Sequence, residues 1–161
     1  MWDKSKNGNK EYGTGAQRVS VQYRHRNAYS PKKPVFTFRD LEVYQKTMEA
    51  SVIIMRNLKN KLKVLKYDFI DNLAQCSMAV PLYLGEGHSL RFGDHKKAIL
   101  LLENAMAGCN KMIIYLEQIK GIYGSKIDQD LIDDLVKRYA DARGKIFRLE
   151  KAWQKFTSSE Q

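Results

Sequence analysis

The chain has 161 residues, with 28 Lys and Arg against 18 Asp and Glu, a formal net charge of +10 and an isoelectric point near 9.6. This length predicts one domain, and a hydrophobic fraction of 43% is enough for a packed core. Three prolines exclude a proline-rich or collagen-like chain, and two cysteines exclude a disulfide scaffold and favour a reducing compartment. No apolar run approaches the roughly 20 residues that span a bilayer, and no signal-peptide pattern opens the chain. We therefore expect a soluble cytoplasmic protein.

The positive charge is concentrated near the N-terminus. Residues 1–35 carry a net charge of +6 and show no apolar periodicity, so the rest of the chain carries only +4. We predict a flexible basic arm over 1–36, ended by Pro31 and Pro34 because proline disfavours helix in the residue before it. A helical domain over 37–157 and a short tail over 158–161 complete the expected organisation.

The first predicted helix covers residues 37–66. Thr37 is its expected N-cap, and Asp40 lies in the first turn, where the backbone N–H groups favour an acidic side chain. Apolar residues at steps of three and four place one stripe on one face of this helix. The stripe consists of Leu41, Tyr44, Met48, Val52, Met55, Leu58, Leu62 and Leu65.

The second predicted helix covers residues 67–86. Pro81 interrupts its apolar stripe and is expected to bend it near 77–81, because proline removes a backbone hydrogen bond. Gly85 and Gly87 follow, and glycine commonly supplies the left-handed residue at which a helix ends.

The third and fourth predicted helices have the most regular spacing. Asp94 caps the third, which ends at Gly121 or Gly124, and Ser125 or Asp128 caps the fourth. Both carry heptad-type seams that predict nearly parallel packing, and small residues on the third seam allow close approach to a neighbour such as the fourth helix. The seams are Ala98, Leu102, Ala105, Cys109, Met112, Leu116 and Ile119, and Ile132, Leu135, Tyr139, Ala142, Ile146, Leu149, Trp153 and Phe156. Together the four helices predict an all-α, up-down-up-down four-helix bundle.

The histidines and cysteines form no pattern typical of a metal site. A di-iron bundle needs two Glu-x-x-His pairs, and the sequence has none. His25 lies in the arm, whereas His88 and His95 are expected to be exposed at the corner between the second and third helices. Cys76 and Cys109 are expected to be buried as small apolar residues. We therefore expect no metal, no cofactor and no nucleophilic cysteine.

Glu86 lies between two glycines, an unusual setting for a carboxylate. It could accept backbone N–H groups at a bent helix end, pair with Arg91 or another cation, or be an exposed residue at a helix end. A catalytic role with His88 or His95 has little support, because no base or second carboxylate stands in a recognisable pattern. We expect a protein that is not an enzyme.

Basic residues give the strongest functional signal. Four cations of the first predicted helix recur at steps of three and four, which places them on one face, and no acidic residue lies between them. We interpret this face as a phosphate-contacting surface. Its residues are Arg56, Lys59, Lys63 and Lys66. The fourth predicted helix ends with Lys145, Arg148, Lys151 and Lys155, but the helix dipole explains cations at that end.

The arm adds a second basic stretch, in which Tyr23 and Tyr29 alternate with cations. Aromatic side chains can stack on unpaired bases while cations contact phosphates. A solvated tail would have a similar composition, so both interpretations stay open. The predicted phosphate-contacting residues of the arm are Arg24, Arg26, Lys32 and Lys33.

Two stretches resemble a known family. FRDLEVYQK at 38–46 and AVPLYLGEGHS at 79–89 are similar to the four-helix-bundle proteins encoded in intervening sequences of bacterial large-subunit ribosomal RNA genes. The second stretch matches that family's most typical pattern at Val80, Pro81, Leu84, Glu86 and Gly87. It departs from the pattern at Tyr83 and Gly85, where the family has Asn and Ala. The spacing around Leu101–Ala105 continues the match, but Lys111 stands where the family has Glu.

The resemblance, which covers about 38–120 and more loosely extends to 156, implies a homo-oligomeric and often pentameric bundle. It extends to the related accessory variability determinant of diversity-generating retroelements, a basic pentamer that binds nucleic acid and a reverse transcriptase. Our leading hypothesis is a non-enzymatic, homo-oligomeric bundle that binds RNA, another nucleic acid or a ribonucleoprotein. The alternative is an oligomeric protein-interaction scaffold that binds no nucleic acid and whose arm docks an acidic partner.

Overall fold

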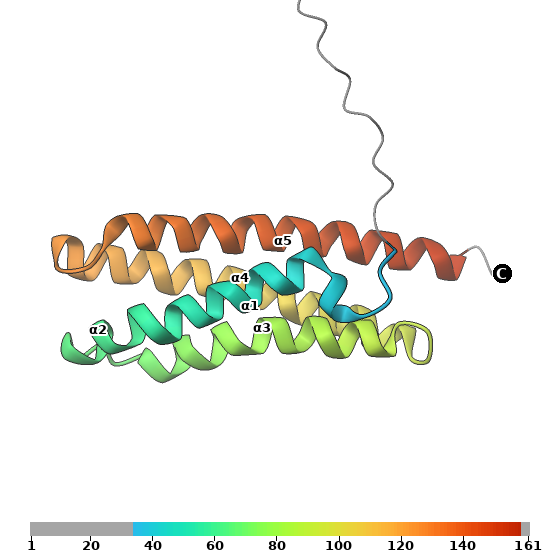
Figure 1. Ribbon diagram of the computed structural model, residues 1–161, viewed down its shortest axis with the longest axis horizontal. Coiled ribbons are helices and arrows are strands. Elements are labelled where there is room, and N and C mark those ends of the chain that lie inside the picture. Colours follow the sequence, from blue (N-terminus) through green and yellow to red (C-terminus); the bar gives the residue numbers. More distant parts are fainter. Residues whose placement is uncertain (1–33, 159–161) are drawn as a thin grey trace, which may run out of the picture. The chain divides into compact units, whose positions relative to one another are not determined.

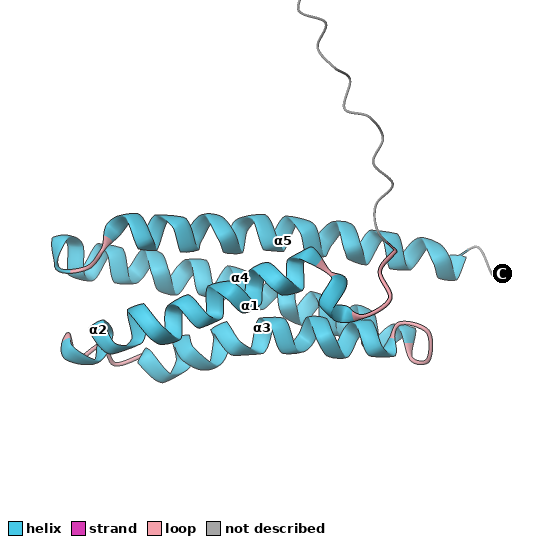
Figure 2. Cartoon of the chain, viewed as in Figure 1, coloured by secondary structure: helices cyan, strands magenta, loops and turns pink. Residues whose placement is uncertain are grey.

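The computed structural model describes residues 34–158, of which 87% are helical, and no strand occurs in this range. The all-α class predicted from the apolar periodicity is confirmed. The long helices lie side by side (Figure 1), and short loops and turns connect them (Figure 2). The predicted arm up to Lys33, with Arg24, Arg26 and Lys32, lies outside the described residues, as does 159–161.

The first helical segment is interrupted, in contrast to the single helix predicted over 37–66. Its parts are η1 (Phe38–Asp40), α1 (Glu42–Ile53), the π-helical turn η2 (Ile54–Leu58) and α2 (Lys59–Val64). Leu41 is extended and separates η1 from α1. Thr37 and Asp40 interact as expected, but around the short η1 turn: the Asp40 carboxylate accepts the backbone N–H of Thr37 at 2.8 Å.

The buried face of α1 differs from the predicted stripe. Five of the eight predicted stripe residues are exposed or half-buried, namely Tyr44, Met48, Val52, Met55 and Leu65. The buried residues are instead Val43, Thr47, Ala50, Ser51 and Ile54. The prediction was wrong because two buried residues are polar and pair their hydroxyls inside the helix: Thr47 Oγ1 donates to the Val43 carbonyl at 2.9 Å, and Ser51 Oγ to the Met48 carbonyl at 2.8 Å.

The wider π turn of η2 changes which residues follow the buried face. Leu58 and Leu62 are fully buried, as predicted, and continue the face begun by Ile54. Of the predicted stripe, Leu41, Leu58 and Leu62 are therefore buried, whereas the stripe residues from Tyr44 to Met55 and Leu65 are not.

Helix α3 (Ile70–Leu90) begins and ends later than predicted. It passes through Pro81, Gly85 and Gly87 and ends before Arg91, so neither glycine stops it. Gly87 serves close packing instead, because a Cβ at this position would lie 3.3 Å from the carbonyl oxygen of Ala98 on the next helix. The second predicted helix is thus confirmed in its existence, and its predicted end is wrong.

Helices α4 (His95–Tyr123) and α5 (Gln129–Ser158) match the prediction closely. The Asp94 side chain accepts the backbone N–H of Lys97 at 3.0 Å, and the Asp128 side chain accepts that of Leu131 at 3.0 Å. Gly124, with φ 51°, ends α4. The predicted seam of α4 is fully buried. In α5 the seam residues from Ile132 to Ala142, Ile146 and Trp153 are buried, and Leu149 is half-buried.

The helices enclose one core: α1 packs on α3 and α5, and α4 also packs on α3 and α5. The tightest approach joins α3 to α4, where a Cβ on Gly108 would lie only 2.7 Å from Cγ2 of Val80. Gly108 therefore brings α4 close to α3, and α4 also packs extensively on α5, the neighbour that the spacing suggested.

Within the described residues, one helical stretch, His95–Lys126, is long and apolar enough to cross a membrane, with a mean hydropathy of 1.2. This corrects the expectation that no such stretch exists. The stretch combines its buried seam with exposed apolar residues such as Leu100, Ile114 and Ile122, which raise its hydropathy. One such helix is weak evidence of a membrane, because the core helix of a packed bundle meets the same criterion.

Candidate nucleic-acid interface

Five cations gather in eleven residues at the end of the first helical segment. We call residues 56–66 the basic segment; its cations are Arg56, Lys59, Lys61, Lys63 and Lys66. No acidic residue occurs between Glu49 and Asp68. Lys59 is half-buried and the other four are exposed. The structure thus places all four cations predicted on this helix, and adds Lys61, which lies off the face that α-helical spacing defined.

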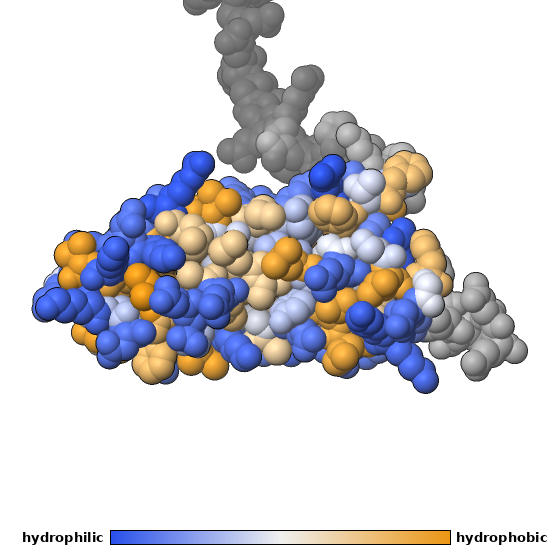
Figure 3. All heavy atoms as spheres, turned by 90° about the horizontal axis from the view of Figure 1, so that it is seen from below, coloured by the Kyte–Doolittle hydropathy of each residue, from blue (hydrophilic) through white to orange (hydrophobic). Residues whose placement is uncertain are grey.

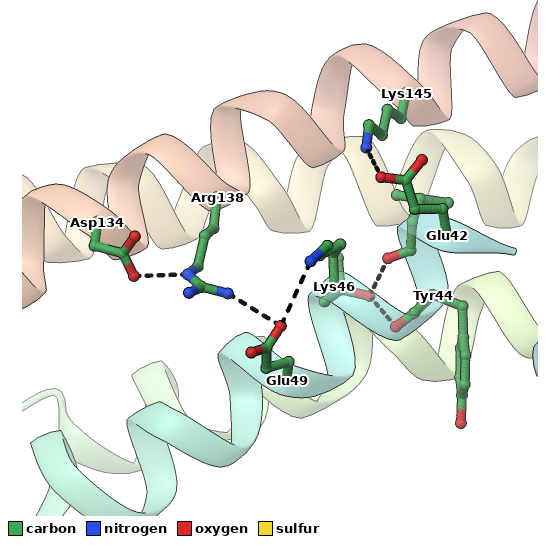
Figure 4. Close-up of polar contacts among 9 residues, drawn as sticks. Glu42, Tyr44, Lys46, Glu49, Asp134, Arg138 and Lys145 are labelled. Carbon is green, nitrogen blue, oxygen red and sulfur yellow. Dashed lines mark hydrogen bonds and ion pairs between the residues drawn. The ribbon is translucent and has the colours of Figure 1, made fainter.

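No cation of the basic segment forms an ion pair with a carboxylate in residues 34–158. Cations between α1 and α5 are engaged, by contrast (Figure 4): Arg138 contacts Glu49 at 3.1 Å and Asp134 at 2.6 Å, and Lys145 pairs with Glu42. The charge of the basic segment therefore remains available to an anion from outside the described chain.

Two of the four predicted cations near the end of α5 lie close to carboxylates of the same chain. Lys145 pairs with Glu42 of α1, and Lys151 lies 3.8 Å from the buried carboxylate of Glu150. The sequence analysis explained these cations by the helix dipole. For Lys145 and Lys151 the structure shows ion pairs as a further explanation. These cations are therefore not part of the candidate interface.

The basic segment ends in a residue that adopts an unusual backbone conformation. Lys66 has φ 54°, and its N–H donates to the Lys63 carbonyl while that of Tyr67 donates to the Leu62 carbonyl. This pattern usually places glycine at the left-handed position, which costs other residues about 1–2 kcal/mol. Position 66 is therefore occupied by a lysine in a backbone conformation that glycine adopts more easily.

The helix dipole alone does not explain five cations. The C-terminal end of a helix carries the equivalent of about half a negative charge, and its effect falls off within the last turn. Lys61 and Lys63 lie in the last turn of α2, but Arg56 lies in η2, before α2 begins. Most of the positive charge of the basic segment therefore exceeds what the dipole can neutralise.

Acidic residues limit the interface on one side. The hydroxyl of Tyr123, at the end of α4, donates to the Leu65 carbonyl at 3.4 Å, so the start of α5 lies at the same end of the helices. Asp128, Asp130, Asp133 and Asp134 crowd the beginning of α5, and among them Asp133 is bound by Lys120 at 2.6 Å. A bound polyanion would be repelled from that side and kept over the basic segment.

The motif residues Pro81, Glu86 and Gly87 lie in the interior of α3. Pro81 and Gly87 are buried, whereas Glu86 is exposed and forms no hydrogen bond or ion pair with another described residue. Of the interpretations left open for Glu86, exposure is observed, but inside a helix rather than at its end. Arg91 does not pair with Glu86 and contacts His88 instead.

The prediction that His88 is exposed is wrong: only 5% of the residue is exposed. The helix continues past the glycines and turns this side chain inward, 6.4 Å from the Trp153 ring. Arg91 Nη1 lies 3.0 Å from Nδ1, and Nε2 has no partner among the described residues. Burial first, and then the charge of Arg91, lower the pKa of His88 below its usual 6.5, against a weaker opposite effect of Asp40.

We expect the stability of the protein to fall as the pH drops below about 6.5. The unfolded imidazole takes up a proton near that pH, and the folded one does so only at lower pH, so acid favours unfolding. The melting temperature of the wild type should therefore fall more between pH 7.5 and 5.5 than that of His88→Gln. Equal decreases in the melting temperatures of the two proteins would show that protonation of His88 does not cause the loss of stability.

The two cysteines are not activated thiols. Cys109 is fully buried, which raises the pKa of its thiol to about 12, and burial also raises the pKa of the half-buried Cys76. The Cys76 thiol donates to the Gly108 carbonyl at 3.5 Å. Among residues 34–158, His, Cys, Asp and Glu side chains form no group of three that could hold a metal ion.

No protein-family model, curated protein or solved structure matches this chain. The resemblance to the proteins of ribosomal RNA intervening sequences therefore rests on the two stretches at 38–46 and 79–89. What it implies about assembly and partners enters below as a proposal.

Proposed function

We propose that this protein binds single-stranded RNA without catalysing a reaction, and that its helices form an up-down-up-down four-helix bundle. The observation that carries the proposal is the basic segment: five cations in eleven residues, none paired with a carboxylate in the described part of the chain. Nucleic-acid affinity depends mainly on cations that neutralise phosphates and release counterions.

The dimensions of the basic segment suit several phosphates. The eight helical steps from Arg56 to Val64 cover about 12 Å at 1.5 Å per residue, and Lys66 lies in the turn beyond them. The cations of the arm, with Tyr23 and Tyr29, would add phosphate contacts and stacking on unpaired bases. This combination favours a single strand over a duplex, whose bases are already stacked.

Self-association would multiply these contacts. The family resemblance supports a homo-oligomer, often a pentamer, and a reverse transcriptase as a protein partner. Each copy would contribute one basic segment and one arm, so a strand bound by two copies would gain affinity through effective concentration.

A non-enzymatic role is supported by the placement of the titratable groups. Cys109, Tyr139 and His88 lie in the core, and burial raises the pKa of the first two and lowers that of His88. None of them lines the groove between α1 and α3. Active sites, by contrast, usually combine shifted groups inside a cleft.

The test is the salt dependence of RNA binding by the full chain. With a fluorescently labelled single-stranded RNA, the logarithm of the association constant should fall linearly with the logarithm of salt concentration. Four or more neutralised phosphates give a slope of about −3 or steeper, because each contributes about −0.7 for a single strand. Light scattering on nuclease-treated protein would report the subunit number in the same samples.

A lack of binding at low salt, or an affinity independent of salt, would contradict the proposal. The alternative function, a protein-interaction scaffold, would then be favoured if a pull-down of a protein partner survived nuclease treatment.

A further inference from the structure

An apolar groove of about 920 Å³ lies between the first helical segment and α3. Met48, Val52 and Met55 line one wall, and Met78 and Leu82 line the other. These side chains are well exposed for their type: 61% of Leu82 and 49% of Met78 are accessible. Apolar patches of this kind are visible among hydrophilic residues in Figure 3. A contiguous apolar surface commonly marks an interaction site.

The groove has the dimensions of a helix-binding site. Along its first wall it extends from Tyr44 to Arg56, which is about 18 Å or slightly more than three helical turns. Two antiparallel or parallel helices with a trough between them accommodate a third helix that inserts its own side chains.

Methionine makes this lining adaptable. Three of the five wall residues are Met48, Met55 and Met78. The unbranched thioether side chain adjusts to irregular partners, and it is used for this reason on surfaces that bind helices of varied sequence.

The charges around the groove favour an acidic occupant. Arg56 lies at one end of the first wall, and Lys97 contributes a second cation from α4. Glu86 is the one acidic residue in the described lining. Beyond Arg56 the rest of the basic segment continues in the same direction, so a helix that leaves the groove there would pass further cations.

A second copy of the chain is a poorer occupant on the same grounds. The chain has a net charge of +10, so a second copy lacks the acidic residues that would complement the cations at this groove. The outer face of α4 carries the exposed apolar residues Leu100 and Ile114, but it also carries Lys96 and Lys111 beside Glu103. With Glu117 this face carries two lysines and two glutamates, so it brings no net negative charge to a groove whose margins are positive.

We propose that the groove binds an amphipathic helix of a partner protein, with an apolar face of three to four turns and acidic residues beside it. This goes beyond the proposed RNA binding, because the apolar walls make no use of phosphates. The site shares only Arg56 with the basic segment.

The proposal can be tested with two synthetic peptides of about 18 residues and the full-length protein. Both peptides repeat Leu at positions i, i+3, i+4 and i+7; one has Glu beside the apolar face and the other has Lys. Fluorescence anisotropy should show that the Glu peptide binds at least tenfold more tightly than the Lys peptide. Leu82→Gln combined with Met78→Gln should weaken its binding at least tenfold.

Leu100→Gln is the matched control, because Leu100 is exposed to a similar extent, 54%, but lies outside the groove. It should leave peptide binding unchanged. The groove variants should keep the RNA affinity of the wild type, so a failure of this proposal can be told apart from a failure of RNA binding. Equal binding of both peptides, or unchanged binding by the groove variants, would overturn it. So would a lower subunit number of the groove variants in light scattering, since a second copy would then be the occupant.

Discussion

Reversing three charges of the basic segment is expected to lower the affinity for single-stranded RNA by roughly two orders of magnitude or more. The variant carries Lys59→Glu, Lys63→Glu and Lys66→Glu. It removes three phosphate contacts and replaces each with a repulsive charge. Arg56 is left unchanged because it also lines the apolar groove. The salt slope should become shallower by about two, since three contacts at about 0.7 each are lost.

The fold should tolerate this change. None of the three lysines pairs with a carboxylate among residues 34–158, so no ion pair is broken. Glu at position 66 meets the same left-handed backbone as Lys. Circular dichroism should therefore show unchanged helicity, apart from a small loss of stability from acidic residues near a helix C-terminus.

A control variant tests whether the position of the reversed lysines, or only the net charge of the protein, determines the affinity for RNA. Lys96→Glu, Lys111→Glu and Lys137→Glu change the net charge by the same amount at exposed positions outside the basic segment. This variant should lose affinity only a few-fold, through weaker long-range attraction. Equal losses in the two variants would show that overall charge, rather than the basic segment, attracts RNA. No loss in either would contradict RNA binding at these residues.

The fold was most predictable where apolar spacing alone decides burial. The seams of α4 and α5 follow steps of three and four without exception, and both caps, Asp94 and Asp128, accept the backbone N–H groups expected. Along α1 the same rule fails, because Thr47 and Ser51 are buried with their hydroxyls paired inside the helix. Hydropathy assigns such residues to the surface, and sequence spacing does not reveal the π turn that follows.

The end of α3 was missed because glycine has two uses in a helix. Gly85 and Gly87 resemble a stop signal, but Gly87 is required where the backbone of α4 comes close. The helix that continues through them carries His88 inward, so one wrong boundary also produced the wrong exposure.

The basic segment was found from charge alone, since the lack of acidic neighbours is a property of the sequence. The apolar groove was not. One wall of it consists of residues that the predicted stripe assigned to the core, namely Met48, Val52 and Met55. Only the structure shows that α1 turns these residues outward and buries a face containing Thr47 instead.

The contact between α3 and α4 gives the strongest prediction about stability. Gly108→Ala is expected to lower the free energy of unfolding by about 1–3 kcal/mol, the usual cost of overpacking a core. A Cβ there would lie 2.7 Å from Cγ2 of Val80. Val80 is fully buried and, as a β-branched residue in a helix, has essentially one rotamer, so its methyl group cannot turn away.

The same substitution at Gly121 is expected to raise the free energy of unfolding instead of lowering it. Gly121 lies in the same helix, and a Cβ there would meet nothing within 4 Å. Gly121→Ala should therefore raise stability by about 0.5–1 kcal/mol, the difference in helix propensity. Urea unfolding followed by circular dichroism, at one fixed protein concentration because of possible self-association, measures both variants.

A double variant tests whether the clash itself causes the loss. Val80→Ala removes the methyl groups that a Cβ at position 108 would strike, although alone it leaves a cavity and lowers stability. In the double variant the new Cβ occupies part of that cavity, so the combined loss should be smaller than the sum of the two single losses by about 0.5–3 kcal/mol. Strict additivity would mean that α3 and α4 separate to accommodate the new methyl group, and that their close approach at Gly108 contributes little to the fold.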